Sequence, residues 1–123
     1  MDVGVKIAKT DLNPLIFMEW IKIFASVGEA NLRLVENIPQ LLILHGKRIS
    51  LVLRKGEYFA FSDACPHNGE SLHKGKVNFM GEIVCPLHEY RFRIQTGKEA
   101  EERCRDLKTY FVRIDDTGFY IGL

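Results

Sequence analysis

The sequence has few cysteines and almost no excess charge, and both shortages narrow the classes to which it can belong. Only three cysteines occur among 123 residues, and two of them fall in motifs suited to metal ligation. No pair therefore remains for a disulfide, which fits a reducing compartment. The formal net charge of +1 favours neither nucleic acid nor an anionic lipid surface as a partner.

Long apolar runs are also missing. No run approaches the ~18 residues that a helix needs to cross a bilayer, so no membrane span is expected. The first six residues, Met1 to Lys6, include an early acid and no apolar core of signal-peptide length. We therefore expect a cytoplasmic protein, and a chain of this length predicts a single domain over residues 1–123.

Near the amino terminus the sequence predicts one strand. Residues 18–24 combine partial alternation of polar and apolar side chains with β-forming residues. The alternative is a short amphipathic helix that begins at Asp11. Asn13-Pro14 predicts a turn before this segment, and the polar stretch from Ser26 to Asn31 predicts a connection after it.

Most of the remaining chain predicts hairpins. Two β-rich runs flank the link Gly46-Lys47, and Lys55-Gly56 makes the next turn before a third strand at 58–61. A last hairpin is expected from 109–114 and 119–123, and we expect its strands to pair with the early ones. Turns spaced roughly eight to twelve residues apart indicate an all-β fold, an antiparallel sandwich or barrel.

Two short motifs hold the candidate metal ligands. Cys65-Pro66-His67 is followed, after 17 intervening residues, by Cys85-Pro86-Leu87-His88. Two thiolates and two imidazoles form a four-ligand set that zinc and iron–sulfur centres both accept. The other candidates match neither spacing. We interpret His45 as a solvated turn residue, His73 as a surface residue and Cys104 as a small, partly buried residue.

The residues around the two motifs identify a specific resemblance. Glycines and apolar residues recur in register with them, at Asn68-Gly69, Leu72, Gly75, Gly81, Tyr90, Phe92 and Thr96-Gly97. Together, over roughly residues 57–97, they resemble the signature of the Rieske iron–sulfur domain family. The resemblance implies an antiparallel β sandwich or barrel base, with a small cluster-binding subdomain of two loops inserted at about 63–94.

The resemblance also implies the cofactor and its ligands. One [2Fe–2S] cluster per chain is expected, with Cys65 and Cys85 on one iron and His67 and His88 on the other. Two ferric ions, two sulfides and two thiolates sum to zero charge, so reduction leaves a single negative charge. A cluster with four thiolates begins with two negative charges and is harder to reduce, so histidine ligation raises the potential.

Departures from the pattern indicate the subtype. Respiratory Rieske proteins carry a disulfide between the ligand loops, but Glu70 and Leu87 stand at those positions, and Tyr90 replaces a serine. The chain therefore resembles the Rieske-type ferredoxins more closely. Within that group Glu89 replaces a common glycine, and the segment 101–104 lacks the prolines that many relatives have there.

These features predict a soluble one-electron carrier and not an enzyme. The resemblance implies that it passes electrons from a flavoprotein reductase to a terminal oxygenase or another oxidoreductase. One alternative is a Rieske-like small subunit of a larger oxidoreductase of the nitrite reductase type. A remote alternative is a structural zinc site built from the same four residues. An autonomous oxygenase would need an open iron site with two histidines and a carboxylate, for which His45 and His73 have no evident partner.

Overall fold

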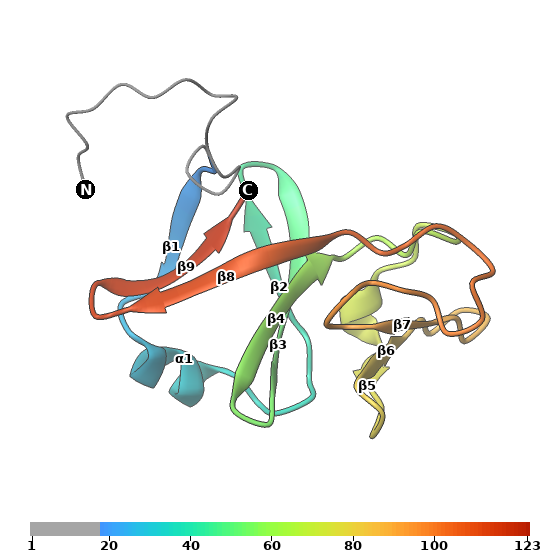
Figure 1. The fold of residues 1–123 in the computed structure, drawn as a ribbon, viewed down its shortest axis with the longest axis horizontal. Coiled ribbons are helices and arrows are strands. Elements are labelled where there is room, and N and C mark those ends of the chain that lie inside the picture. Colours follow the sequence, from blue (N-terminus) through green and yellow to red (C-terminus); the bar gives the residue numbers. More distant parts are fainter. Residues whose placement is uncertain (1–17) are drawn as a thin grey trace.

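Two antiparallel sheets form the framework of the protein (Figure 1). The structure is a computed structural model that describes residues 18–123. The six-stranded sheet has the order β1-β9-β8-β4-β3-β2. Its strands are β1 (Trp20–Phe24), β2 (Gln40–Leu44), β3 (Lys47–Arg54), β4 (Glu57–Ser62), β8 (Thr109–Asp115) and β9 (Gly118–Gly122). The three-stranded sheet has the order β5-β6-β7, with β5 (Lys76–Val77), β6 (Glu82–Val84) and β7 (Arg91–Arg93).

The pairing of the first and last strands confirms the predicted all-β base. β1 is a strand, as predicted for residues 18–24, and it pairs with β9 from Trp20↔Gly122 onwards. β8 pairs with both β9 and β4, so the carboxyl-terminal hairpin joins the two halves of the sheet. The turn predicted at Asn13-Pro14 and the helix start considered at Asp11 lie outside the described residues.

The predicted hairpins are present, and one turn is shifted by a residue. β2 and β3 are joined by His45 and Gly46, with φ of 50° and 79°, and not by Gly46-Lys47. Two successive residues with positive φ match a type I′ turn, which favours glycine at its second position. Lys55 and Gly56 repeat this geometry between β3 and β4. His45 is exposed, as predicted, and its Nδ1 lies 3.3 Å from Glu19 Oε1.

The connection predicted from Ser26 to Asn31 is wrong, because this stretch forms the helix α1 (Val27–Arg33). Ser26 Oγ accepts a hydrogen bond from the Glu29 N–H at 3.1 Å. Glu29 Oε1 in turn accepts one from the Ala25 N–H at 2.7 Å. This reciprocal arrangement resembles a capping box, which satisfies backbone donors that a helix start leaves free. Ala30 is buried against the six-stranded sheet.

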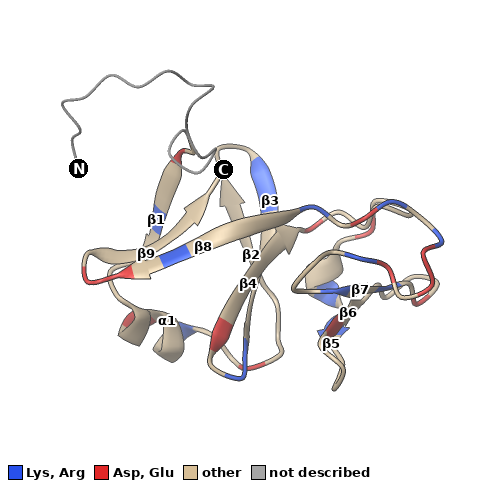
Figure 2. Cartoon of the chain, viewed as in Figure 1, with Lys and Arg blue, Asp and Glu red and all other residues tan. Residues whose placement is uncertain are grey.

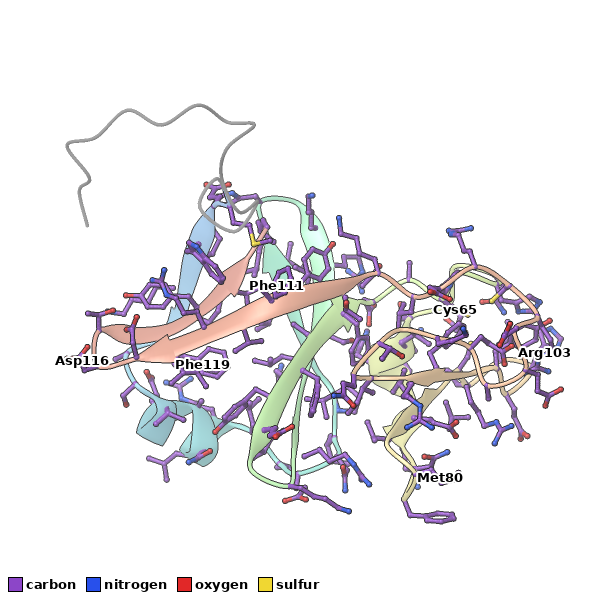
Figure 3. All side chains as sticks on the ribbon, in the orientation of Figure 1. Cys65, Met80, Arg103, Phe111, Asp116 and Phe119 are labelled. Carbon is purple, nitrogen blue, oxygen red and sulfur yellow. The ribbon has the colours of Figure 1, made fainter. Side chains whose placement is uncertain are left out.

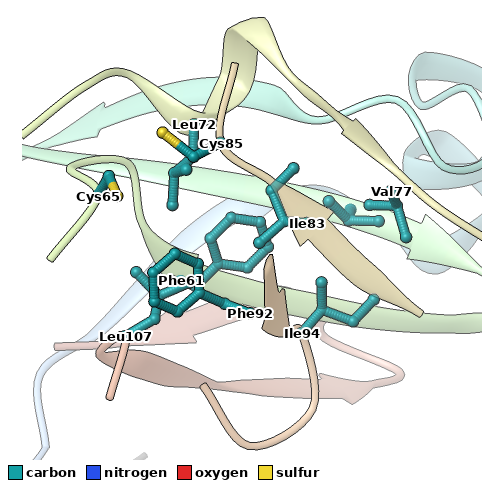
Figure 4. Packing of buried hydrophobic residues seen from close by; sticks show 10 residues of the cluster. Phe61, Cys65, Leu72, Val77, Ile83, Cys85, Phe92, Ile94 and Leu107 are labelled. Carbon is teal, nitrogen blue, oxygen red and sulfur yellow. The ribbon is translucent and has the colours of Figure 1, made fainter. Parts of the chain in front are cut away.

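Strands β3 and β4 contribute to two separate hydrophobic cores, because successive residues of a strand point to opposite faces. The base core lies beneath α1 and contains Ala30, Leu34, Ile49, Leu51, Ala60, Phe119 and Ile121. The site core lies on the other side (Figure 4) and contains Val52, Phe61, Cys65, Leu72, Val77, Ile83, Cys85, Phe92, Ile94 and Leu107. Two of the predicted metal ligands are therefore part of a packed core.

Close backbone approaches hold the small sheet and its loops together. A Cβ atom at Gly75 would collide with the carbonyl oxygen of Val84, the last residue of β6. Gly97 has φ of +83°, and a Cβ there would collide with the carbonyl oxygen of Leu107. Only glycine fits these two contacts without a backbone shift. Within residues 18–123, no helix is long and apolar enough to cross a membrane.

Candidate metal centre

Two short loops, each closed by its own backbone hydrogen bonds, carry the predicted ligands. In the first loop the Cys65 N–H donates to the Glu70 carbonyl at 2.9 Å, and the Gly69 N–H donates to the Cys65 carbonyl at 2.7 Å. In the second loop the Cys85 N–H donates to the Tyr90 carbonyl at 2.8 Å. Each loop thus begins at a cysteine whose backbone is fixed. The histidines lie further along, at the loop tips.

The four predicted donors form a buried pair and an exposed pair. Cys65 and Cys85 are 2% and 0% exposed, and their thiols are within interaction distance of each other. His67 and His88 are exposed, and their ring centroids lie 5.6 Å apart with the planes at 85°. The thiols therefore face the site core, and the imidazoles face the surface.

Burial disfavours the thiolate form of Cys85 when no cation is nearby. It raises the pKa of Cys85 to about 11, and the neighbouring Cys65 and Glu70 add to the rise. The Leu87 backbone N–H acts in the opposite direction by favouring the thiolate. A bound metal ion reverses this balance, because a coordinating thiol is deprotonated outright. The buried thiol pair is thus suited to a strongly charged metal centre.

The division of the four donors into two pairs bears on which metal group they fit. In the part of the chain that the structure describes, no group of three or more His, Cys, Asp or Glu side chains converges as a single ion requires. A structural zinc site needs four ligands around one ion. A [2Fe–2S] cluster needs only two protein ligands on each iron, and the two cysteines and two histidines form such pairs. The donor set therefore fits a cluster.

The backbone at the tip of the second loop is left-handed at two successive residues. His88 has φ of 70° and Glu89 has φ of 56°. Glycine adopts this region at no steric cost, so the glycine common in the Rieske-type ferredoxins would relax the loop. Glu89 instead keeps the geometry with its side chain exposed. It places a carboxylate next to His88 at the surface.

The first loop is held by a buried carboxylate that sequence reasoning missed. Asp63 accepts hydrogen bonds from the Ser50 hydroxyl at 2.9 Å and from the His73 N–H at 2.8 Å. His73 Nδ1 lies 2.9 Å from Asp63 Oδ1, and His73 is half-buried, so it lies at the surface with one side of its ring held by Asp63. Burial alone raises the pKa of Asp63, but these hydrogen bonds outweigh burial and lower it.

The segment 99–105 lies beside the two loops, and it also carries contacts that the sequence did not predict. Cys65 and Arg103 lie at the same end of the molecule, opposite Asp116 (Figure 3). In this segment between β7 and β8 the acidic residues come first and the two arginines follow (Figure 2). Cys104 is partly buried against the site core, as predicted. A run of mixed charges normally indicates a solvated surface, so no signal in the sequence marked its contacts.

Comparison with known proteins decides the family. Residues 25–111 match the model of the Rieske [2Fe-2S] domain. The chain belongs to this family. A [2Fe–2S] cluster is therefore its cofactor, and the paired donors described above fit such a group.

Two curated relatives of the chain are ferredoxin components of dioxygenase systems. The chain is 34% identical over 90 residues to the ferredoxin subunit of 3-phenylpropionate/cinnamic acid dioxygenase from Photorhabdus laumondii, covering 72% of this chain and 78% of the relative. It is 36% identical to the ferredoxin component of the naphthalene 1,2-dioxygenase/salicylate 5-hydroxylase systems of a Ralstonia species, covering 59% and 70%. The ferredoxin of carbazole 1,9a-dioxygenase from Nocardioides aromaticivorans IC177 has a similar structure. Its TM-score is 0.70 at 25% identity, covering 83% of this chain and 95% of that chain.

Proposed function

We propose that this protein is a one-electron carrier whose Rieske cluster is held by Cys65 and Cys85 on one iron and by His67 and His88 on the other. The observation that carries the proposal is the division of the donors into a buried thiol pair and an exposed imidazole pair, on two closed loops. When bound, the cluster accepts and releases one electron and does not itself transform a substrate.

Each pair of residues has a distinct task in this proposal. The two cysteines anchor the centre in the site core, where few water molecules compete with the metal–sulfur bonds. The two histidines present their rings at the surface, so an electron can reach a docked protein over a short distance. Because imidazole is neutral, the reduced centre carries only one negative charge, which favours reduction at an accessible potential.

The proposed domain organisation follows the two sheets. Residues 1–123 form one domain, in which a cluster-binding subdomain at about 63–94 is inserted into the β base. The contribution of Val52 and Phe61, from β3 and β4, to the site core supports a single folding unit. The inserted region therefore relies on the base for part of its hydrophobic packing.

The partners are proposed from the relatives. Those relatives belong to dioxygenase systems as ferredoxin subunits or components, which supports a terminal oxygenase or another oxidoreductase as the acceptor. A flavoprotein reductase is the proposed donor, and the cytoplasm is the proposed location. Neither nucleic acid nor a membrane has a role in this proposal.

Anaerobic purification followed by reduction tests the proposal. We expect a red-brown protein with two irons and two acid-labile sulfides per chain, and an electron paramagnetic resonance signal typical of mixed cysteine and histidine ligation. Reduction by a flavoprotein reductase encoded nearby should then be followed by reoxidation on mixing with the oxygenase. A protein that holds only zinc after anaerobic reconstitution would refute the cluster. Stable co-purification with a large catalytic subunit would instead support the small-subunit alternative.

A further inference from the structure

Glu99 is a charged residue that the proposed electron transfer does not use, yet it is almost completely buried, with 1% of its surface exposed. Its Oε1 accepts hydrogen bonds from the Arg103 N–H at 2.7 Å and from the Glu101 N–H at 3.2 Å. A buried carboxylate is costly unless hydrogen bonds and a counter-charge compensate for lost hydration. Glu99 has both, and they fold the following residues back over it.

Arg103 supplies the counter-charge and is held in a fixed plane. Its Nη2 lies 2.6 Å from Glu99 Oε2, and its Nε lies 3.2 Å from the same oxygen. Two such bonds orient the flat guanidinium group, which an ammonium group could not reproduce. The guanidinium group also lies over an aromatic ring, because Arg103 Cζ is 3.9 Å from the centroid of the Tyr90 ring.

Tyr90 transmits this arrangement to a proposed iron ligand. Its ring stacks on the His67 ring with 3.8 Å between centroids and 10° between planes. Tyr90 closes the second loop and His67 lies in the first, so the stack connects the two loops. A face-to-face stack leaves the ring nitrogens of His67 free at the edge, where metal coordination occurs.

We propose that Glu99, Arg103 and Tyr90 form a brace that fixes the orientation of the His67 ring, so that all three are positioning residues for the cluster. This inference rests on the proposed ligand role of His67. The segment 99–105, which has no proline, thereby acts on the metal centre through a stack of planar groups. The carboxylate sets the guanidinium plane, the guanidinium supports the phenol ring, and the phenol ring supports the imidazole.

A purely stabilising role explains these contacts less well. Glu99 is buried and the Arg103 side chain is about one-third exposed. Such an ion pair contributes little to stability compared with apolar residues of the same size, because desolvation of the carboxylate opposes the attraction. Apolar side chains at 99 and 103 could fill the same space, but they would not hold a flat cation against Tyr90. The pairing of Glu99 with Arg103 also cancels their charges, so the brace adds almost no net charge beside the cluster.

The experiment compares variants of the cluster-loaded protein. Tyr90→Leu removes the stack, Tyr90→Phe keeps the ring, and Arg103→Lys keeps the positive charge without the plane. The chain offers a matched control, because Arg113 lies over the Tyr120 ring at 4.3 Å on the six-stranded sheet. Tyr120→Leu and Arg113→Lys make the same chemical changes away from both ligand loops. The readouts are the width of the resonance signal of the reduced cluster and the rate of iron release to a chelator.

We expect Tyr90→Leu to broaden the signal and to speed iron release about two- to tenfold, the range that loss of an aromatic pair implies. Arg103→Lys should show a smaller change of the same kind, and Tyr90→Phe should behave like the wild type. Both control variants should leave the signal width and the release rate unchanged. If Tyr90→Leu does not load, the comparison of Arg103→Lys with Arg113→Lys still decides the matter.

Two results would overturn the brace. One is a fully loaded Tyr90→Leu protein with the signal and release rate of the wild type. The other is equal effects of Arg103→Lys and Arg113→Lys, which would indicate only a general loss of stability. A wild-type protein without any cluster would overturn the proposed function as well, whereas a normal wild-type cluster with unaffected variants would overturn the brace alone.

Discussion

The Ser50 hydroxyl donates a hydrogen bond of 2.9 Å to the buried carboxylate of Asp63, which ties strand β3 to the start of the first ligand loop. We expect Ser50→Ala to lower the free energy of unfolding by about 1–3 kcal/mol, because a buried carboxylate loses one of its donors. Urea unfolding measures this loss. The control is Thr117→Ala, which removes a hydroxyl that donates a hydrogen bond to the exposed Asp115. We expect it to lower the free energy of unfolding by about 0.5 kcal/mol or less. Equal losses of unfolding free energy in the two variants would contradict the argument that burial of the Asp63 carboxylate makes its hydrogen bond more costly to remove.

The cap of helix α1 gives a second prediction about stability. Ser26→Ala removes the acceptor of the Glu29 N–H and should lower the free energy of unfolding by about 0.5–2 kcal/mol. Ser71 precedes the 3-10 turn Leu72–Lys74 but makes no side-chain cap bond. Ser71→Ala is therefore the matched control, and we expect a smaller change in the same urea titration. A larger effect at Ser71 would mean that the two caps are misassigned.

The three cysteines should differ sharply in their effect on the cluster. Cys65→Ser and Cys85→Ser should lose the cluster or weaken it severely, because each removes a buried thiol of the ligand pair. Cys104→Ser should retain it, since Cys104 only packs against the site core. Iron and acid-labile sulfide are measured in all three variants. Loss of the cluster from Cys104→Ser would show that the ligand assignment or the packing argument is wrong.

Removal of iron should loosen the loops and leave the base folded. The base core contains no proposed ligand, whereas the loops gain order from metal binding. Backbone circular dichroism of the iron-free protein should therefore stay β-like, while hydrogen exchange across residues 64–90 becomes faster. Complete unfolding on iron removal would mean that the site core also supports the base.

The Glu99–Arg103 pair predicts a loss of stability in acid. Hydrogen bonding to Arg103 lowers the pKa of Glu99 to about 2, from an ordinary value of 4.5, even though burial opposes the shift. The unfolded chain therefore takes up a proton that the folded chain does not accept. The stabilisation is present above about pH 4.5 and is lost as the pH falls towards 2.

This loss can be measured by urea unfolding of the iron-free protein at a series of acidic pH values. Glu99→Gln should flatten the dependence of the unfolding free energy on pH across that window. Glu102→Gln is the control, because Glu102 is exposed and lies 3.7 Å from the Lys98 ammonium. If both variants keep the wild-type slope, Glu99 does not carry the acid sensitivity.

The parts that the sequence predicted well are those with local signals. The hairpin turns at glycine follow from turn chemistry, and the strands beside them follow from the runs of β-forming residues. The sequence does not predict helix α1 because it is short and contains a glycine, although Ser26 and Glu29 have the spacing of a capping box. The shift of one hairpin turn to His45-Gly46 follows from the preference of glycine for the second turn position.

Other features depend on contacts between distant segments and have no local signal. Glu99 lies in a charged run, and only the folded chain shows that it is buried beneath Arg103. Likewise, the stack of Tyr90 on His67 requires two loops that are far apart in the sequence to meet. His73 lies near the ligands in sequence, but its partner Asp63 is ten residues away on the other side of the first motif.

The division of strands β3 and β4 between two cores limits how this metal centre can be transplanted into another scaffold. Leu51 and Val52 are neighbours in β3 but belong to different cores, and the same is true of Ala60 and Phe61 in β4. A graft of the two ligand loops alone would leave the thiols without the apolar packing that Val52 and Phe61 provide. A designer would need to transfer both strands, or to build equivalent apolar packing, before the loops could hold a cluster.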